Sequence, residues 1–278
     1  MPRKPMLGRS DRGGQSVCKT VATSSTLVPA SKKKRMQFIE DIHKYTEDGI
    51  DYLSVTTFLK KFQEWVDWDE ICRKKAKKLG VAYEDLRKEW NDARDKGANR
   101  GTAFHKYMED KYSTEVVVDT TLYPVVSLPT LSGVKEESSM KLQNNIVYTE
   151  KMIWNKRYAV CGTADVVEVI DGKINIKDYK TNKKLDTEAW KHPVTGPKKL
   201  KFPVQGLDDC NFNLYSLQVN LYMYMLLQAN RNLKIGKMTL LHIHFNEDGN
   251  STMMIPYEVK NLQREVQGML ETYLKTKK

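Results

Sequence analysis

The sequence is short of cysteine, of long apolar runs and, near its beginning, of acidic residues, and each shortage argues against a class of protein. Its 278 residues include four cysteines without a Cys-x-x-Cys spacing. This argues against a zinc knuckle or a disulfide framework and indicates a reducing compartment. No stretch approaches about 18 consecutive apolar residues, so we expect no transmembrane helix and no membrane partner.

The compartment follows from the same shortages. The first residues lack the continuous apolar segment of a signal peptide, which predicts an intracellular protein. The cytoplasm of a phage or bacterial host fits this composition, and a mitochondrial location is the alternative.

Positive charge is concentrated in residues 1–35. The formal net charge is +11, and this segment holds nine Lys or Arg residues and one acid, a balance of +8. The other 243 residues therefore carry only +3, so the isoelectric point alone does not indicate a nucleic-acid-binding surface. We interpret residues 1–35 as a disordered basic arm. A solvated tail, a phosphate-binding arm and an organelle-targeting segment stay open as its role.

Strand and helix patterns alternate after this arm. The first half predicts a hairpin over residues 36–55, then a short helix capped by Ser54. A helical stretch over 68–95 is broken at Gly80, and a new helix begins after Gly97. The segment 115–140 has no clear period, and we interpret it as a loop or insertion. The second half predicts three strands over 145–180, a loop or small ribbon over 190–212, a helix over 214–228, and a closing strand pair followed by a terminal helix.

This order predicts an α/β fold of mixed α+β type, with a central mixed sheet flanked by helices. We expect one domain over residues 36–278. It comprises an N-terminal hairpin and helices (36–95), a core (96–260) and a terminal helix (261–278).

An acid and a lysine end what otherwise resembles a buried strand. Asp178 and Lys180 share the parity of two isoleucines, so all four side chains face the same side. Asp165 lies thirteen residues before Asp178, across a predicted turn at Asp171-Gly172. Carboxylates on adjacent strands, about 4.8 Å apart, can bind one Mg²⁺ or Mn²⁺ ion, and a lysine can stabilise charge on a phosphate. This pattern suits metal-assisted phosphodiester hydrolysis. The alternative is a solvated Asp178–Lys180 pair on a half-exposed strand.

The spacing D-x(12)-D-x-K of Asp165, Asp178 and Lys180 resembles the PD-(D/E)XK nuclease superfamily, and specifically its RecB-like branch. Further elements occur in the order of that branch. His105 ends a G-x-x-x-H element, Glu150 lies in an upstream strand, and Gln218 begins a Q-x-x-x-Y element. The resemblance implies a restriction-endonuclease-like core.

The resemblance also implies roles for individual residues. The ion would be bound by His105, Asp165, Asp178 and the backbone carbonyl of Tyr179, while Lys180 would align the attacking water. Glu150 would support these ligands, and the alternative that it binds the ion itself stays open. DNA would be contacted by a further set of side chains, namely Arg100, Thr181, Gln218 and Tyr222. For Gln218 the alternative is a core residue that bonds to a neighbouring backbone group.

An upstream pattern over residues 45–59, Y-x-x-x-G…Y-x-S-V-T-x-x-L, is similar to mitochondrial genome maintenance exonucleases and phage exonucleases. Together the resemblance covers residues 36–260. It implies a Mg²⁺- or Mn²⁺-dependent DNA exonuclease that prefers single strands and acts in replication, recombination or repair. A helicase, a polymerase or a single-strand-binding or annealing protein would be its partner. Because no cysteine follows Cys210, we expect no iron–sulfur cluster.

Two other functions fit the same residues. One is a structure-selective or nicking endonuclease on the same fold, and the other is a DNA-binding recombination accessory protein without catalysis. The lysine-rich segment 191–203 does not discriminate between these functions, because its sequence fits a DNA-contacting hairpin and a solvated loop equally well.

Overall fold

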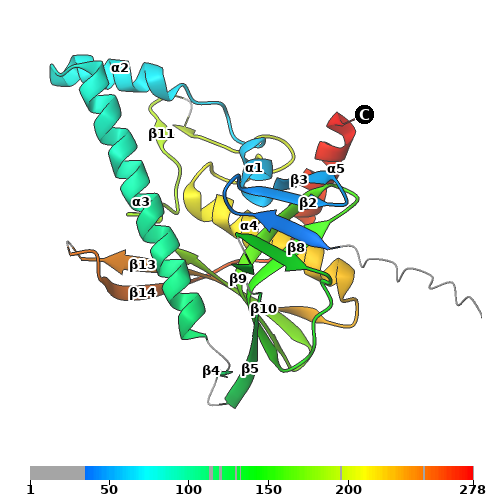
Figure 1. Cartoon of the computed structure of the whole chain (residues 1–278). Coiled ribbons are helices and arrows are strands. Elements are labelled where there is room, and N and C mark those ends of the chain that lie inside the picture. The colour runs from blue at the N-terminus through cyan, green and yellow to red at the C-terminus, as the bar shows by residue number, and fades with distance from the viewer. Residues whose placement is uncertain are drawn as a thin grey trace, which may run out of the picture. The chain divides into compact units, whose positions relative to one another are not determined.

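The fold is organised around a large mixed β-sheet with helices on both faces (Figure 1). A computed structural model describes residues 35–112, 115–118, 121–128, 130–131, 133–194, 196–246 and 248–277. These residues belong to one compact unit. The predicted basic arm, residues 1–35, lies outside them apart from Arg35. The predicted fold class, a mixed α/β fold with a central mixed sheet, is confirmed.

Five long strands make the part of the sheet that carries the candidate site. Three of them form an antiparallel meander, the next strand is parallel to the last of these, and a final strand is antiparallel to it. In sheet order they are β8 (Ile146–Asn155), β9 (Val160–Ile170), β10 (Lys173–Lys180), β13 (Lys234–Phe245) and β14 (Ser251–Glu258). The predicted turn between β9 and β10 is confirmed, because Asp171 and Gly172 both have positive φ, 50° and 71°.

The N-terminal strands extend this sheet. The predicted hairpin is present as β2 (Lys44–Glu47) and β3 (Ile50–Ser54), and β1 (Met36–Ile39) precedes it. Strand β3 pairs in parallel with β9 and thereby joins this group to the core.

The prediction of a loop or insertion over residues 115–140 is wrong for most of that segment. It contains β4 (Glu115–Val118), β5 (Thr121–Ser127), β6 (Thr130–Leu131) and β7 (Val134–Glu137). Strand β7 pairs with β1, and β5 pairs with β8. These two pairings join strands that are separated in the sequence. The segment itself lacks the alternation of apolar and polar residues that would predict a strand.

Two helices precede the long helix of the site. Helix α1 (Val55–Lys60) begins at Ser54, whose hydroxyl accepts a hydrogen bond from the Thr57 backbone nitrogen, as predicted. Helix α2 (Trp68–Leu79) ends at Gly80, which has a left-handed φ of 69°. The predicted break at Gly80 is therefore confirmed.

The predicted new helix after Gly97 is wrong. A single helix, α3 (Tyr83–Lys111), runs through this glycine, and the predicted boundary between residues 95 and 96 lies inside it. One glycine in a helix costs only about 1 kcal/mol relative to alanine, and good helix formers surround Gly97.

Helices α3 and α4 cover opposite faces of the core strands. Helix α4 (Asn211–Ala229) buries apolar side chains around most of its circumference and packs on one face, with α5 (Gln263–Thr276) beside it. On the other face, Phe104 and Met108 of α3 pack against Val166 and Tyr179. The segment after β10 holds the short ribbon of β11 (Lys191–His192) and β12 (Gly196–Pro197). Among the described residues, none of the helices combines the length and the hydropathy that crossing a membrane requires.

Candidate active site

A break in strand alternation turns two acids toward helix α3. Tyr148 and Ile153 of β8 are five residues apart, yet both pack in the core under α4, whereas strict alternation would place them on opposite faces. Between them Glu150 has a φ of 49°, which is uncommon for a residue other than glycine. The β8–β9 ladder pairs the residues on either side of Glu150 and Asp165 and leaves these two opposite one another. Both carboxylates can therefore face α3.

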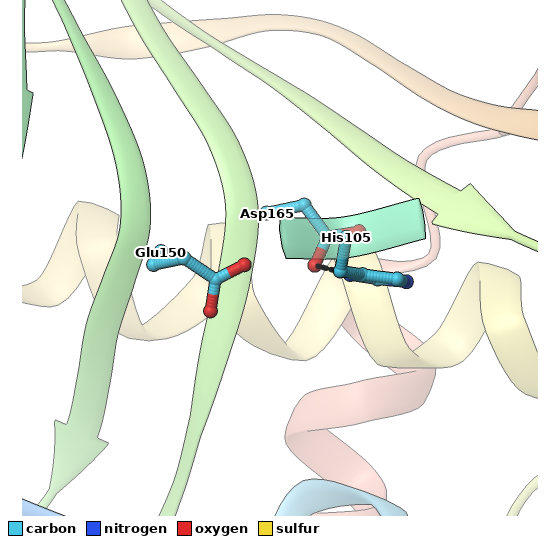
Figure 2. Close-up of side chains that lie close together, drawn as sticks. All are labelled: His105, Glu150 and Asp165. Carbon is cyan, nitrogen blue, oxygen red and sulfur yellow. Dashed lines mark ion pairs between the residues drawn. The ribbon is translucent and has the colours of Figure 1, made fainter. Parts of the chain in front are cut away.

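Helix α3 supplies a histidine to these acids. His105 Nδ1 lies 3.2 Å from Asp165 Oδ1. One ligand atom from each of His105, Glu150 and Asp165 lies within 4.8 Å of the others. Figure 2 shows the Glu150 carboxylate pointing toward the paired side chains of Asp165 and His105. A small cavity of about 10 Å³ lies among them and Glu109, roughly the room that one water molecule needs.

The electrostatics of this cluster favour a cation. Burial lowers the pKa of His105, but the Asp165 carboxylate acts in the opposite direction and the pKa is raised overall to about 9. Burial raises the pKa of Glu150 to about 7, and the neighbouring Asp165 adds to that rise. The Asp165 carboxylate contributes to both shifts, and a bound divalent ion would offset its negative charge.

Asp178 lies opposite Asp165 in the strand register, one step beyond the last β9–β10 pair. Asp178 is 1% exposed, and its Oδ2 lies 2.6 Å from Lys180 Nζ. Burial raises the pKa of Asp178 to about 6, and the ammonium of Lys180 limits this rise. The alternative of a solvated surface pair is therefore wrong, because a carboxylate buried this deeply needs its partner.

Lys180 is held by a chain of polar contacts that extends into helix α4. Its Nζ donates to Gln218 Oε1 at 3.1 Å, and Gln218 Nε2 donates to Tyr222 Oη at 3.1 Å. The ammonium also lies 4.3 Å from the ring centroid of Tyr215. Gln218 thus bonds to two side chains, so the alternative of a core residue bonded to a neighbouring backbone group does not describe it.

Gly162 and Gly101 permit two close approaches at the site. A Cβ on Gly162 would lie 2.8 Å from the Tyr222 ring, and a Cβ on Gly101 would lie 2.9 Å from Thr181 Oγ1. The glycine of the G-x-x-x-H element therefore allows α3 to approach the end of β10. Beside it, Arg100 Nη2 donates to the Thr181 carbonyl at 3.2 Å.

Two clefts meet at His105. The first, which we call the basic cleft, has a volume of about 710 Å³, and Arg100, Lys180 and Thr181 line it together with Lys96 and Lys183. Among the described residues that line it there is no Asp or Glu. The second, which we call the aromatic cleft, has a volume of about 430 Å³. Its lining includes Phe38, Tyr45, Lys135, Glu150 and His105.

The structure reproduces the predicted site in part. It brings His105 next to Asp165 and places Arg100, Thr181 and Lys180 in one cleft. It departs from the predicted ligand set at Asp178, which pairs with Lys180, and at Glu150, which lies among the possible ligands instead of behind them. Tyr179 contacts the site through its backbone nitrogen, which donates a hydrogen bond to Asp165 Oδ2 at 2.6 Å.

Sequence reasoning missed one lysine at the site. Lys135 comes from β7, and its Nζ lies 3.6 Å from Glu150 Oε2. No local signal points to it, because the segment around it has no recognisable period and its pairing partner β1 is about 100 residues away.

The donor set fits a hard divalent cation. Carboxylate oxygens and one imidazole are ligands that suit Mg²⁺ or Mn²⁺. His105, Glu150 and Asp165 are the described residues whose ligand atoms meet closely enough to share one ion. All three cysteines in the described part of the chain are buried.

Comparisons with known proteins give no family for the chain. No family model matches it, and no curated protein matches it. Among solved structures it is similar to one titled "Crystal structure of SSO0001", with 13% sequence identity over 81% of this chain and 76% of that chain. The TM-score is 0.30, so this likeness supports no conclusion about fold or function.

Proposed function

We propose that the protein is a Mg²⁺- or Mn²⁺-dependent deoxyribonuclease that hydrolyses phosphodiester bonds from DNA ends. One observation carries this proposal: the possible ligand atoms of His105, Glu150 and Asp165 converge within 4.8 Å, at the end of a cleft that contains Lys180. A carboxylate-rich ion site next to a buried lysine is the arrangement that metal-assisted phosphodiester hydrolysis needs. The resemblance of the sequence to RecB-like nucleases supports the same reading.

The chain's own residues have distinct tasks in this reaction. His105, Glu150 and Asp165 would hold the ion, and Asp178 would contribute negative charge from the adjacent strand. When bound, a divalent ion supplies a Lewis acid that polarises the scissile phosphate and lowers the pKa of water. Lys180 is oriented by Asp178 and Gln218, so its ammonium can align the attacking water and stabilise charge on a phosphate oxygen.

The basic cleft supplies the surface for the DNA strand. Its lining includes Lys96, Arg100, Lys180 and Lys183, and no Asp or Glu is among the described residues of that lining, so its surface can attract phosphates. Tyr215 and Phe245 line the same cleft and offer apolar surface to sugars and bases. A polymer with regularly spaced negative charges fits this lining better than a small neutral substrate.

The test is a time course on end-labelled linear DNA, single- and double-stranded, with Mg²⁺, with Mn²⁺ and with EDTA. We expect digestion with either ion and none with EDTA, and the released label reports polarity and strand preference. Lack of digestion under every condition with ion would contradict the proposal and favour a non-catalytic DNA-binding protein.

A circular single-stranded substrate separates exonuclease from endonuclease. An enzyme that requires ends leaves the circle intact while it digests the same sequence in linear form. Linearisation of the circle would replace the proposed exonuclease by a nicking or structure-selective endonuclease.

A further inference from the structure

The aromatic cleft has an ordered wall that the roles above do not use. In the register of three neighbouring strands, Tyr45 of β2 pairs with Phe38 of β1, and Phe38 pairs with Lys135 of β7. Residues paired across strands project from the same face of the sheet. The rings of Phe38 and Tyr45 stack with centroids 4.4 Å apart. The row therefore presents an apolar surface that ends in an ammonium group.

The lysine at the end of this row is buried and lies beside the candidate ion site. Lys135 is 8% exposed, and its Nζ lies 3.6 Å from Glu150 Oε2. A buried ammonium is costly unless it is paired, and at 3.6 Å this pair is longer than a strong charged hydrogen bond of about 2.7–2.9 Å. Lys135 can therefore also bind an anionic group that enters the cleft next to His105 and Glu150.

The rest of the lining includes residues of helix α3 and of β9. Gly101, Thr102 and His105 line the cleft on the helix side, and Thr163, whose Oγ1 is 3.1 Å from Tyr45 Oη, lines it on the sheet side. The volume of about 430 Å³ lies within the range of about 300–1,000 Å³ that small-molecule pockets have. Apolar rings, hydroxyl groups and one buried cation match the three parts of a nucleotide: base, sugar and phosphate.

We propose that the aromatic cleft binds one nucleoside monophosphate unit, the terminal nucleotide that is released from the DNA end. Its phosphate lies between Lys135 and the candidate ion site, and its base packs on the wall formed by Phe38 and Tyr45. This inference rests on the proposed function for the identity of the ligand as a nucleotide. The cleft takes a single unit, because the carboxylates of Glu40 and Glu109 also line it and would repel a second phosphate.

Calorimetric titration tests the site with thymidine 5′-monophosphate, thymidine 3′-monophosphate, thymidine and inorganic phosphate, in Mg²⁺. We expect a monophosphate to bind, and Lys135→Met to weaken it by about tenfold or more. Phe38→Ala should weaken both the nucleotide and thymidine by about threefold to tenfold. The comparison of the 5′- and 3′-monophosphates shows which phosphate the cleft receives.

Lys44→Met is the matched control. Lys44 lies next to Tyr45 on β2 but is half exposed and pairs with Asp51, so its replacement should leave nucleotide affinity within about twofold. Thermal unfolding of each variant reports whether it folds. Should Lys135→Met fail to fold, magnetisation transfer from the bound thymine to the ring protons of Phe38 and Tyr45 in the wild-type protein decides the question.

Three results would overturn the inference. They are no monophosphate binding to the wild type up to about 10 mM, equal affinity in folded Lys135→Met and Phe38→Ala, and binding of inorganic phosphate as tight as that of the nucleotides. DNA digestion by the same preparations is measured separately. Digestion without nucleotide binding contradicts this site alone, whereas nucleotide binding without digestion contradicts the proposed function alone.

Discussion

The basic cleft and the aromatic cleft share His105 and helix α3 but differ in charge. In the described lining of the basic cleft there are lysines and an arginine and no acids, whereas the aromatic cleft combines two lysines with Glu40, Glu109 and Glu150. A lining of one sign suits a long polyanion that is attracted at several points. A mixed, aromatic lining suits a small ligand that is bound by shape and by one charge. This difference is the basis for proposing that the basic cleft binds the DNA strand and that the aromatic cleft binds a single nucleotide.

The largest effect should come from removing the ion site that both clefts share. Asp165→Asn keeps the shape of the side chain but removes one negative charge next to His105, so we expect DNA digestion to fall by at least about a hundredfold. Lys180→Met should lower it to a similar extent. Initial rates on end-labelled DNA measure both. Asp171→Asn, in the turn between β9 and β10, is the matched control and should digest at the wild-type rate. Wild-type digestion by Asp165→Asn would show that the cluster is not the catalytic site.

The next effect concerns the packing of Gly162 on Tyr222, beneath the basic cleft. Gly162→Ala places a Cβ 2.8 Å from the Tyr222 ring, and overpacking of this kind lowers the free energy of unfolding by about 1–3 kcal/mol. Because Tyr222 holds Gln218, which holds Lys180, digestion should also fall. Denaturant unfolding gives the free energy.

Gly97→Ala is the counterpart on helix α3. Its Cβ would have nothing within 4 Å, so alanine should raise the free energy of unfolding by about 0.5–1 kcal/mol. Equal effects of the two alanines would argue against the close packing of Gly162 on Tyr222.

A smaller effect should separate the two clefts directly. Lys96 and Lys183 are exposed and line the basic cleft, so Lys96→Met with Lys183→Met should weaken DNA binding by about tenfold and lower its salt dependence by about two counterions. Nucleotide affinity in the aromatic cleft should not change. Fluorescence anisotropy at several salt concentrations measures the first quantity, with Lys275→Met on α5 as the control. A similar loss of nucleotide affinity would mean that the two clefts are not independent.

The last effect is the protonation of His105, the histidine that both clefts share. In the ion-free protein the pKa of His105 is raised from 6.5 to about 9. The protonated imidazole therefore stabilises the fold below about pH 6.5, and this contribution is lost as the pH rises through about 9. It should amount to roughly 1–2 kcal/mol, because partial exposure of the ring weakens the interaction.

An NMR titration of the His105 ring measures this pKa. Mg²⁺ should lower it, since cation and proton compete for the same group. Asp165→Asn should return it toward 6.5 or below, because burial alone lowers the pKa of an imidazole. An unchanged titration in Asp165→Asn would contradict the ion pair.

Much of the fold could be predicted from local signals. The β9–β10 hairpin, the cap at Ser54 and the break at Gly80 depend on a few neighbouring residues, and the structure confirms them. Strands β4 to β7 were not predicted, because their own pattern is weak and the partners that join them to the core, β8 for β5 and β1 for β7, lie elsewhere in the chain. The error at Gly97 has another cause: the helix penalty of one glycine is small, and the helix formers around it outweigh that penalty.

The candidate site also contains residues that could be predicted from the sequence and residues that could not. The spacing of Asp165, Asp178 and Lys180 indicated an ion site, and the resemblance to RecB-like nucleases added His105. Neither indicated the position of Glu150 or the presence of Lys135. Glu150 faces α3 because it has a positive φ in the middle of strand β8. No residue type in this strand predicts that interruption of the alternation. Lys135 reaches the site only because β7 pairs with β1.

By itself, the sequence indicated which side chains could form the candidate site and where most of the strands and helices lie, because residue types, turn signals and helix caps are local features. Only the tertiary structure decided which acids share one point and that the site opens into two unlike clefts. Those properties depend on strand register and on the approach of α3 to the sheet, and both are set by contacts between residues far apart in the chain.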